Sequence, residues 1–382
     1  MTPAGNAPRA RPPGGRTPSG DASGARGAGA ATAVREAVMG GAAGAADTAA
    51  LAGIARDALV HDVAEAADLV ARLAEPPADR RWTALVTRDL DGAVFASLSG
   101  RDPRVGHVDL LAVRPAAQGA GLGRALLVAA EDWLRDRGAA EIRLAGNPPC
   151  YAWPGVDVRY TPAACLAESL GYRRYHVAWN MTADLTDDPS AGPSAEADLA
   201  ALADQGITVH AAAPGDRAAV RAFVAEQWHD GWAWEAERAT GCHYAARDGE
   251  ILGFAAWGTR PAWFGPMGTA PAARGLGVGR VLARRCLAEQ RAAGLASAQI
   301  GWAGPLGFYA RAFGAYAERV FWLYRRDLTP EGTAAGTDPG KGPRTDPTDP
   351  TDPTDPTDPT TDPGRDPRAT DPRTGLRRGR RP

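Results

Sequence analysis

Apolar residues in the first half of the chain follow two different spacings. Between residues 47 and 75 they recur every three or four positions, which favours helix: Leu51, Ile54, Ala58, Val63, Ala66, Val70 and Leu73. Shorter apolar runs are typical of strands, and Asp91-Gly92 between the first two predicts a hairpin turn. The expected order is a strand in 33–39, the helical region, strands at 82–88, 93–100 and 105–113, a helix to about 137, a strand at 141–146, a helix at 162–170 and strands from 172.

The second half repeats this order. A strand at 207–212 precedes a helix from Asp216 to about Trp228, and Asp248-Gly249 again marks a hairpin turn. The remaining predicted elements are strands at 242–247, 251–258 and 263–269, a helix at 277–293, a strand at 297–302, a short helix at 308–313 and a strand at 319–328. We expect this last strand to close the sheet of the second half.

One glycine-rich stretch occurs in both halves, each time between a predicted strand and a predicted helix. The first copy spans 118–124 (QGAGLGR) and the second spans 274–280 (RGLGVGR). Residues recurring at an offset of 156 are Gly119, Gly121, Gly123, Arg124, Leu126 and Gly138, matched by Gly275, Gly277, Gly279, Arg280, Leu282 and Gly294. A glycine loop that opens a helix presents backbone N–H groups and the positive end of the helix dipole, which suits a phosphate or pyrophosphate.

The ends of the two halves also match, at a shorter offset. Val177, Trp179, Asp184 and Leu185 recur 143 residues later as Val320, Trp322, Asp327 and Leu328. Because the offset falls from 156 to 143, the first half carries an insertion of 13 residues between these anchors. Similarity at so long a period indicates a duplicated domain rather than a solenoid.

A strand followed by Gln/Arg-Gly-x-Gly-x-Gly and a helix resembles the acetyl-CoA loop of the GNAT acetyltransferases, and the chain resembles a tandem GNAT protein over 33–186 and 206–329. The resemblance implies an α/β fold, with two tandem acyl-CoA N-acyltransferase domains, each a mixed α+β sheet flanked by helices. It also implies direct transfer from acetyl-CoA, with no metal, to a small-molecule amine. The layout is similar to two-domain acetyltransferases acting on the mycothiol precursor and on glucosamine-type sugars.

The resemblance assigns cofactor contacts in both halves. The glycines approach the pyrophosphate because they carry no Cβ, and backbone N–H groups near Leu111 or Val113, and near Met267 or Thr269, polarise the thioester carbonyl. The predicted cofactor-binding residues are Val113, Gln118, Gly119, Gly121, Gly123, Arg124, Thr269, Arg274, Gly275, Gly277, Gly279 and Arg280. For Arg124 and Arg280, a solvated helix face is an equal alternative to a phosphate contact.

The two halves differ where the family places a thiolate-protonating tyrosine. Five residues before a closing glycine, the second half has Tyr309 (before Gly314) and the first half has Leu166 (before Gly171). A phenol can donate a proton to sulfur and leucine cannot, so we expect catalysis in the second half. The alternative for Tyr309 is a core tyrosine with its ring packed inside.

The base that deprotonates the amine is left open. Candidates in the second half are Glu226, Asp230, Glu235, Glu237 and His243, with Glu226 and Glu235 named first, and those in the first half are His107 and Asp109. For each of them the alternative is a surface charge or a satisfied polar group in the core. Two aromatic clusters, Trp228, Trp232 and Trp234 and, in the insertion, Tyr151, Trp153 and Tyr160 beside Asp157, suit a cationic amine on a sugar ring. Ordinary packing of loop aromatics is the alternative.

Composition narrows the class of protein further. The net charge of −2 gives no electrostatic case for nucleic acid, and Cys150, Cys165, Cys242 and Cys286 lack metal-site or disulfide spacing. No run approaches about 18 apolar residues, and the first 32 residues lack a signal-type apolar segment. We therefore expect a cytoplasmic protein without membrane contact; the sequence leaves its oligomeric state open.

The predicted organisation is a disordered leader (1–32), GNAT domain 1 (33–186), a linker (187–205), GNAT domain 2 (206–329) and a disordered Thr-Asp-Pro-rich tail (330–382) whose basic end is either solvated or a tether. Two rival interpretations stay open. In one, the protein binds CoA as a sensor without efficient catalysis. In the other, the first half is a structural partner that completes the pocket of the second.

Overall fold

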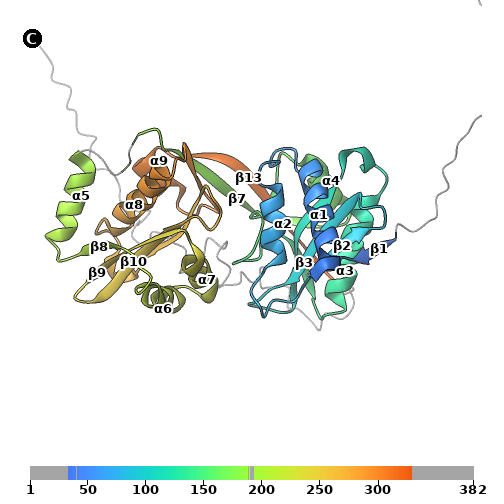
Figure 1. The fold of residues 1–382 in the computed structure, drawn as a ribbon, viewed down its shortest axis with the longest axis horizontal. Helices are drawn as coiled ribbons and strands as arrows, with labels where there is room; N and C mark the ends of the chain where they lie inside the picture. Colours follow the sequence, from blue (N-terminus) through green and yellow to red (C-terminus); the bar gives the residue numbers. More distant parts are fainter. Residues whose placement is uncertain (1–32, 40, 188, 190–192, 329–382) are drawn as a thin grey trace, which may run out of the picture.

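The computed structural model describes residues 33–39, 41–187, 189 and 193–328 (Figure 1). The predicted leader and tail lie outside these residues, as do parts of the predicted linker. The architecture is the expected mixed α/β fold with two similar halves. Among the described residues, no helix combines the length and the apolarity that crossing a bilayer requires.

The first half follows the predicted order. Its elements are β1 (Val34–Glu36), α1 (Gly41–Ala58), α2 (Ala66–Ala74), β2 (Trp82–Thr87), β3 (Gly92–Leu98), β4 (Val105–Val113), η1 (Pro115–Ala117), α3 (Leu122–Arg135), β5 (Glu141–Leu144), β6 (Val156–Asp157), α4 (Thr161–Ser169) and β7 (Arg173–Asp184). The hairpin turn predicted at Asp91-Gly92 is present. The Thr87 hydroxyl oxygen accepts hydrogen bonds at 3.0 Å from the backbone N–H groups of both turn residues.

After one additional helix the second half has the same order, except that its described residues contain no counterpart of the short strand β6. Its elements are α5 (Pro193–Ala203), β8 (Thr208–Ala211), α6 (Arg217–Gln227), α7 (Asp230–Arg238), β9 (Gly241–Arg247), β10 (Glu250–Trp257), β11 (Trp263–Thr269), η2 (Pro271–Ala273), α8 (Val278–Ala292), β12 (Ser297–Ile300), α9 (Leu306–Phe313) and β13 (Tyr316–Asp327). Helix α5 lies within the segment predicted as a linker. The second hairpin turn is also present, with positive φ at Asp248 (53°) and Gly249 (84°).

The two halves share one continuous sheet because they exchange their last strands. Among the described residues the strand order is β1-β2-β3-β4-β5-β13-β7-β12-β11-β10-β9-β8, with β6 attached to β13. The last strand of the chain, β13, pairs with β5 of the first half, and β7 pairs with β12 of the second (Figure 1). The expectation that residues 319–328 close the sheet of the second half is therefore wrong. The closing strands have nearly the same sequence pattern, so periodicity alone cannot assign each to its neighbour.

Side chains from both halves also form one core at the junction. Trp153 of the insertion packs against Trp263 of β11 and Phe321 of β13, with ring centroids 6.0 and 6.1 Å apart. Below them the guanidinium of Arg319 pairs with Asp62 at 2.9 Å and Asp157 at 2.7 Å, and all three side chains are buried. A buried cation between two carboxylates is stable only while its partners stay in place, so this ion-pair cluster ties β13 to the first half.

Candidate active site in the second half

A pocket opens in the second half where two parallel strands separate. Strands β11 and β12 pair only at Trp263 with Gln299 and at Phe264 with Ile300, while β11 continues to Thr269. The pocket has a volume of about 1000 Å³ and extends from this gap to the second glycine loop. Among the predicted site residues, those lining it are Met267, Thr269, Arg274, Gly275, Gly277, Gly279, Arg280, Tyr309 and Glu235.

The loop has the backbone geometry that its glycines predict. Gly275 and Gly277 have φ of +81° and +90°, a conformation that strains any residue with a Cβ. A Cβ at either position would meet no atom within 4 Å, so the space above the backbone is open to a ligand. Gly279 has another role, because a Cβ there would lie 3.2 Å from the Thr269 hydroxyl oxygen. Helix α8 begins at Val278, and the first N–H groups of a helix have no intrahelical acceptor.

Three arginines place positive charge around this loop. Arg274 ends η2, Arg280 lies in the first turn of α8, and Arg311 projects from α9; all three line the pocket. Arg280 also pairs with Asp198 of α5, which is shared with Arg284. Both interpretations of Arg280 therefore stay open. The side chain lines the pocket, where it could contact a phosphate, and it also pairs with another residue of the protein. Arg311 was not predicted, because a single cation on a short helix carries no distinctive pattern.

Tyr309 lies at the pocket wall and in the core at once. Its side chain is 6% exposed, and its ring packs edge-on against Phe264 and Phe308, with centroids 6.1 and 5.1 Å away. Burial raises the pKa of the Tyr309 hydroxyl well above its ordinary value, so the phenol keeps its proton at neutral pH. A protonated phenol at the end of the strand gap can donate to a group in the pocket.

Glu235 is the acidic residue among those that line the pocket. It lies on α7 and is 7% exposed, and its contact among the described residues is the Arg72 guanidinium at 3.4 Å. Burial raises the pKa of its carboxyl group to about 7, and the opposing effect of Arg72 is smaller. A carboxyl group with such a pKa takes up and releases protons near neutrality.

The other predicted bases of the second half do not line this pocket. Glu226 and Asp230 are exposed, and Glu237 pairs with Arg221 and Arg238 on the surface. The His243 ring is buried, and its Nε2 lies 2.9 Å from a carboxylate oxygen of Glu289. Of the five candidates, the structure brings only Glu235 to the pocket.

The predicted aromatic clusters divide between pocket and interior. Trp228, Trp232 and Tyr151 line the pocket, and Tyr151 reaches it from the insertion of the first half. Trp234 instead lies under the Arg238 guanidinium at 4.2 Å, and Tyr160 donates a hydrogen bond to Asp62 at 2.8 Å. Trp153 and Asp157 belong to the junction described above. Three of the six aromatic side chains, Trp153, Tyr160 and Trp234, therefore pack elsewhere in the protein and do not line the pocket.

Sequence reasoning missed His229, which caps helix α7 at the pocket. Its Nδ1 accepts a hydrogen bond from the Trp232 backbone N–H at 3.2 Å, which leaves Nε2 as the protonated nitrogen. Burial, and then the charge of Arg101, lower the pKa of His229 to about 3, so the ring is neutral. A histidine inside a tryptophan-rich stretch could have been suspected as a helix cap from its position before Asp230.

The first glycine loop has the same backbone but different surroundings. Gly119 and Gly121 have φ of +79° and +82°, and α3 begins directly after them. The Gln118 side-chain amide, however, donates to the Val113 carbonyl at 3.0 Å, and Arg124 donates to the Ser169 hydroxyl at 3.0 Å. Where the second half has Tyr309, Leu166 packs beside Gly123, and a Cβ at Gly123 would lie 3.1 Å from it.

His107 and Asp109, the polar residues predicted on β4, are hydrogen-bonded within the first half. The Ser97 hydroxyl donates to Asp109 at 2.6 Å and accepts from the Asn147 amide at 2.8 Å. His107 donates from Nδ1 to the Ala145 carbonyl at 3.1 Å, and burial lowers its pKa to about 3. Burial also raises the pKa of Asp109 to about 7. These groups hold the first half together, and none of them lines the large pocket.

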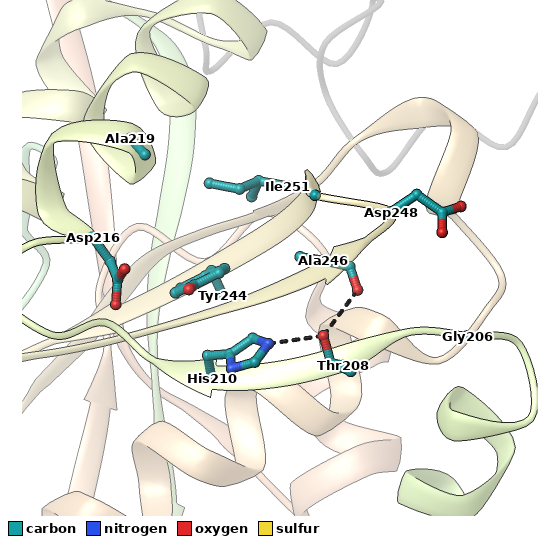
Figure 2. Close-up of a pocket in the computed structure, with 10 residues that line it drawn as sticks. Gly206, Thr208, His210, Asp216, Ala219, Tyr244, Ala246, Asp248 and Ile251 are labelled. Atoms are coloured by element: carbon teal, nitrogen blue, oxygen red, sulfur yellow. Dashed lines mark hydrogen bonds between the residues drawn. The ribbon is translucent and has the colours of Figure 1, made fainter.

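A second, smaller hollow of about 430 Å³ lies at the far edge of the sheet, between β8 and α6 (Figure 2). The His210 ring stacks on Tyr244 with centroids 5.1 Å apart, and its Nε2 is 2.8 Å from the Thr208 hydroxyl oxygen. It contains no glycine-loop residue and no predicted site residue. The large pocket is therefore the candidate site.

Comparison with known proteins agrees with this geometry. The Acetyltransferase (GNAT) family matches residues 55–152 and 214–315, which together make up more than half of the chain. A mycothiol acetyltransferase from Thermomonospora curvata is 38% identical over 110 residues, which is 29% of this chain and 34% of that protein. One from Salinispora arenicola is 33% identical over 146 residues, 38% of this chain and 39% of that protein. The alignments thus span less than half the length of these relatives.

Solved structures show the same architecture. The chain is similar to a GCN5-related glucosamine N-acetyltransferase region of a fungal multi-domain GH3 β-N-acetylglucosaminidase, with a TM-score of 0.63, 19% identity, and coverage of 77% of this chain and 38% of that one. It is also similar to a tandem GNAT protein from the clavulanic acid biosynthesis pathway, with a TM-score of 0.56, 17% identity, and coverage of 78% and 100%. The fold, the repeated glycine loop and the family match agree: this chain belongs to the GNAT acetyltransferase family, in its tandem form.

Proposed function

We propose that the protein is an acetyl-CoA-dependent N-acetyltransferase whose second half carries the active site. It transfers the acetyl group directly to a primary amine of a small molecule, with an amino sugar as the favoured acceptor class. The observation that carries this proposal is the single pocket that joins the second glycine loop, Tyr309 and Glu235 through the gap between β11 and β12.

The loop end of the pocket fits the diphosphate arm of coenzyme A. The open backbone at Gly275 and Gly277, the first turn of α8 and the nearby arginines all favour an anion. Acetyl-CoA supplies the thioester to this reaction. The N–H groups of Met267 and Thr269, on the strand that leads into the loop, are the proposed donors to the thioester oxygen as it gains negative charge.

The two titratable side chains handle the protons. Glu235 accepts a proton from the acceptor's ammonium group, and the free amine then attacks the carbonyl carbon. As the carbon–sulfur bond breaks, Tyr309 donates its proton to the departing thiolate and recovers one from the nitrogen of the new amide. The sum is one amide, one thiol and one proton released, with no covalent enzyme intermediate.

The acceptor class follows from the aromatic and acidic residues that line the pocket. Trp228, Trp232 and Tyr151 provide aromatic faces, and Glu235 provides negative charge among them. Aromatic rings beside a carboxylate attract a cationic amine carried on a sugar ring. The similarity to proteins described as mycothiol acetyltransferases and as a glucosamine N-acetyltransferase region supports the same acceptor class.

The test is acetyl transfer by the purified full chain to a panel of amines, with thiol release and product mass as the measurements. Glucosamine and glucosamine linked to a second ring are expected to be acetylated, whereas glucose and N-acetylglucosamine, which lack the free amine, serve as matched controls. Binding of acetyl-CoA without transfer to any amine would overturn the proposal and favour the CoA-binding sensor instead.

A further inference from the structure

A buried arginine from the first half reaches the proposed base of the second half. Arg72 lies on α2, and its guanidinium donates to the Thr259 carbonyl at 2.9 Å and to the Pro149 carbonyl at 3.0 Å. The same terminal nitrogen that bonds Pro149 lies 3.4 Å from Glu235 Oε1. One side chain thus connects the insertion of the first half, the loop between β10 and β11, and helix α7.

Arg72 differs in this respect from the other arginines at the junction. Arg260 lies between Trp153 and Trp263, donates to the Ala152 carbonyl at 2.6 Å and pairs with Glu65. Arg319 pairs with carboxylates of the first half. Among these three junction arginines of the described chain, Arg72 is the one that contacts a charged group lining the large pocket.

The immediate surroundings of Glu235 make this contact important. The carboxyl group is buried, and the charge that acts on it is that of Arg72 from α2. Burial raises the pKa of Tyr151 and Cys150 in the insertion, and the Glu235 charge in turn adds a smaller rise. Arg101 and His229 line the same pocket farther along, and His229 is neutral. Arg72 is the cation in direct contact, and its Nε is buried without a hydrogen-bond partner among the described residues.

We propose that Arg72 is a positioning residue for acetyl transfer in the second half, holding Glu235 toward the acceptor and setting its charge state. This inference rests on the proposed function. It gives the first half a part in the reaction that does not depend on its own glycine loop. It also explains why the two halves are joined by an exchanged strand, since a small displacement between them would break this contact.

The direction of the effect follows from the electrostatics. Burial raises the pKa of Glu235 to about 7, and the Arg72 charge holds it below the value that burial alone would give. A neutral side chain in place of Arg72 therefore moves this pKa upward. Because an opposite charge at such a distance changes a carboxyl pKa by roughly 1 to 3 units, the shift is measurable.

The experiment compares the pH dependence of kcat/KM for the full chain with Arg72→Met, Arg72→Lys and Arg260→Met. In the wild type, activity rises with pH through about 7 as Glu235 loses its proton. In Arg72→Met the rise in kcat/KM is expected to occur at a pH higher by about one unit or more, and kcat is expected to fall. Arg72→Lys keeps the charge but not the three-way hydrogen bonding, so the rise stays close to its wild-type position while kcat falls.

Arg260→Met is the matched control, since it removes a buried junction arginine that does not contact Glu235. It is expected to lower thermal stability without moving the pH profile. If Arg72→Met and Arg260→Met reduce kcat/KM to the same extent and leave the profile in place, Arg72 is only structural and the inference fails.

A second measurement separates this failure from failure of the proposed function. Infrared difference spectroscopy of the carboxyl band, assigned with Glu235→Gln, follows the titration of Glu235 without any substrate. An unchanged Glu235 titration in Arg72→Met, or in Arg72→Gln should the Met variant not fold, would exclude the positioning role. If the wild type acetylates no amine but the Glu235 titration still shifts in Arg72→Met, the proposed enzymatic function fails. The electrostatic contact between Arg72 and Glu235 is then established independently of it.

Discussion

The two glycine loops have nearly identical backbones and very different neighbours. In both, two glycines at positive φ lead into a helix whose first N–H groups are unpaired. In the second half, Tyr309 and the open gap beyond β11 lie beside the loop. In the first half, Leu166 packs against the corresponding glycine and Gln118 bonds back to the strand.

The comparison extends to one buried carboxyl group in each half. Burial raises the pKa of both Asp109 and Glu235 to about 7. Asp109 accepts a hydrogen bond from Ser97 and lies outside the pocket, whereas Glu235 lines the pocket and, among the described residues, pairs with Arg72. The difference teaches that neither a phosphate loop nor a perturbed carboxyl group makes an active site alone. Both must open on the same cavity.

The largest expected effect comes from blocking the second loop. Gly277→Glu places a carboxylate where the diphosphate binds, and we expect acetyl transfer to fall by about 10³-fold or more because the loop then repels the anion. Calorimetry with coenzyme A and initial rates measure the two consequences.

Gly121→Glu is its matched control, because both glycines have positive φ and both variants bear a strain of about 1–2 kcal/mol. Turnover should survive in this variant. Loss of turnover with Gly121→Glu and its survival with Gly277→Glu would place the active site in the first half.

Removal of the phenol hydroxyl has the next largest effect. Tyr309→Phe keeps the buried ring and is expected to lower kcat by about 10²-fold with little change in KM for the acceptor, because the thiolate then leaves without a proton donor. Steady-state kinetics with an accepted amine measure it. Tyr172→Phe, which removes another buried tyrosine hydroxyl that bonds Glu131 in the first half, controls for simple loss of packing. Equal kcat values for wild type and Tyr309→Phe would leave Tyr309 as a core tyrosine only.

The strand exchange predicts that the halves unfold together. Arg319→Met removes the buried cation between Asp62 and Asp157 and leaves them Arg159, at 4.0 Å and 2.8 Å. Because breaking a buried ion pair is costly, we expect a loss of about 3–5 kcal/mol of unfolding free energy. Urea denaturation of the full chain should show one transition, shifted to lower urea. Arg173→Met, which removes an exposed partner of Asp327, should leave the midpoint in place. Two separate transitions in the wild type would mean that the halves fold independently.

Much of this fold could be predicted from local signals. The hairpin turns at Asp91-Gly92 and Asp248-Gly249 and the strand–loop–helix units are set by backbone preferences within a few residues. The exchange of β7 and β13 could not, because both strands have the same pattern and either can complete either sheet. Only the packing at the junction, around Arg319 and Trp153, distinguishes the two pairings.

The candidate site, like the fold, could be predicted only in part from local sequence signals. Two glycines of each loop have positive φ, and Tyr309 and Glu235 line one pocket. Their roles stay predictions, as do the cofactor contacts of both loops. Arg311 and Arg72 had no local signal, and Arg72 acquires its place through contacts with residues far along the chain. His229 had only the weak signal of a helix cap.

The smallest expected effect tests whether the two buried carboxyl groups are used differently. Unfolded Asp and Glu lose their protons near pH 3.8 and 4.5, while the folded groups hold theirs to about pH 7. Folding stability therefore falls as pH rises between these values, and it stays reduced above about pH 7. Asp109→Asn and Glu235→Gln each remove this dependence, so each should stabilise the protein by about 1–3 kcal/mol at about pH 8 and by little at about pH 4. Urea titrations across this range measure the gain, and only Glu235→Gln should lose acetyl transfer. A variant Asp109→Asn as inactive as Glu235→Gln would contradict the division of labour between the halves.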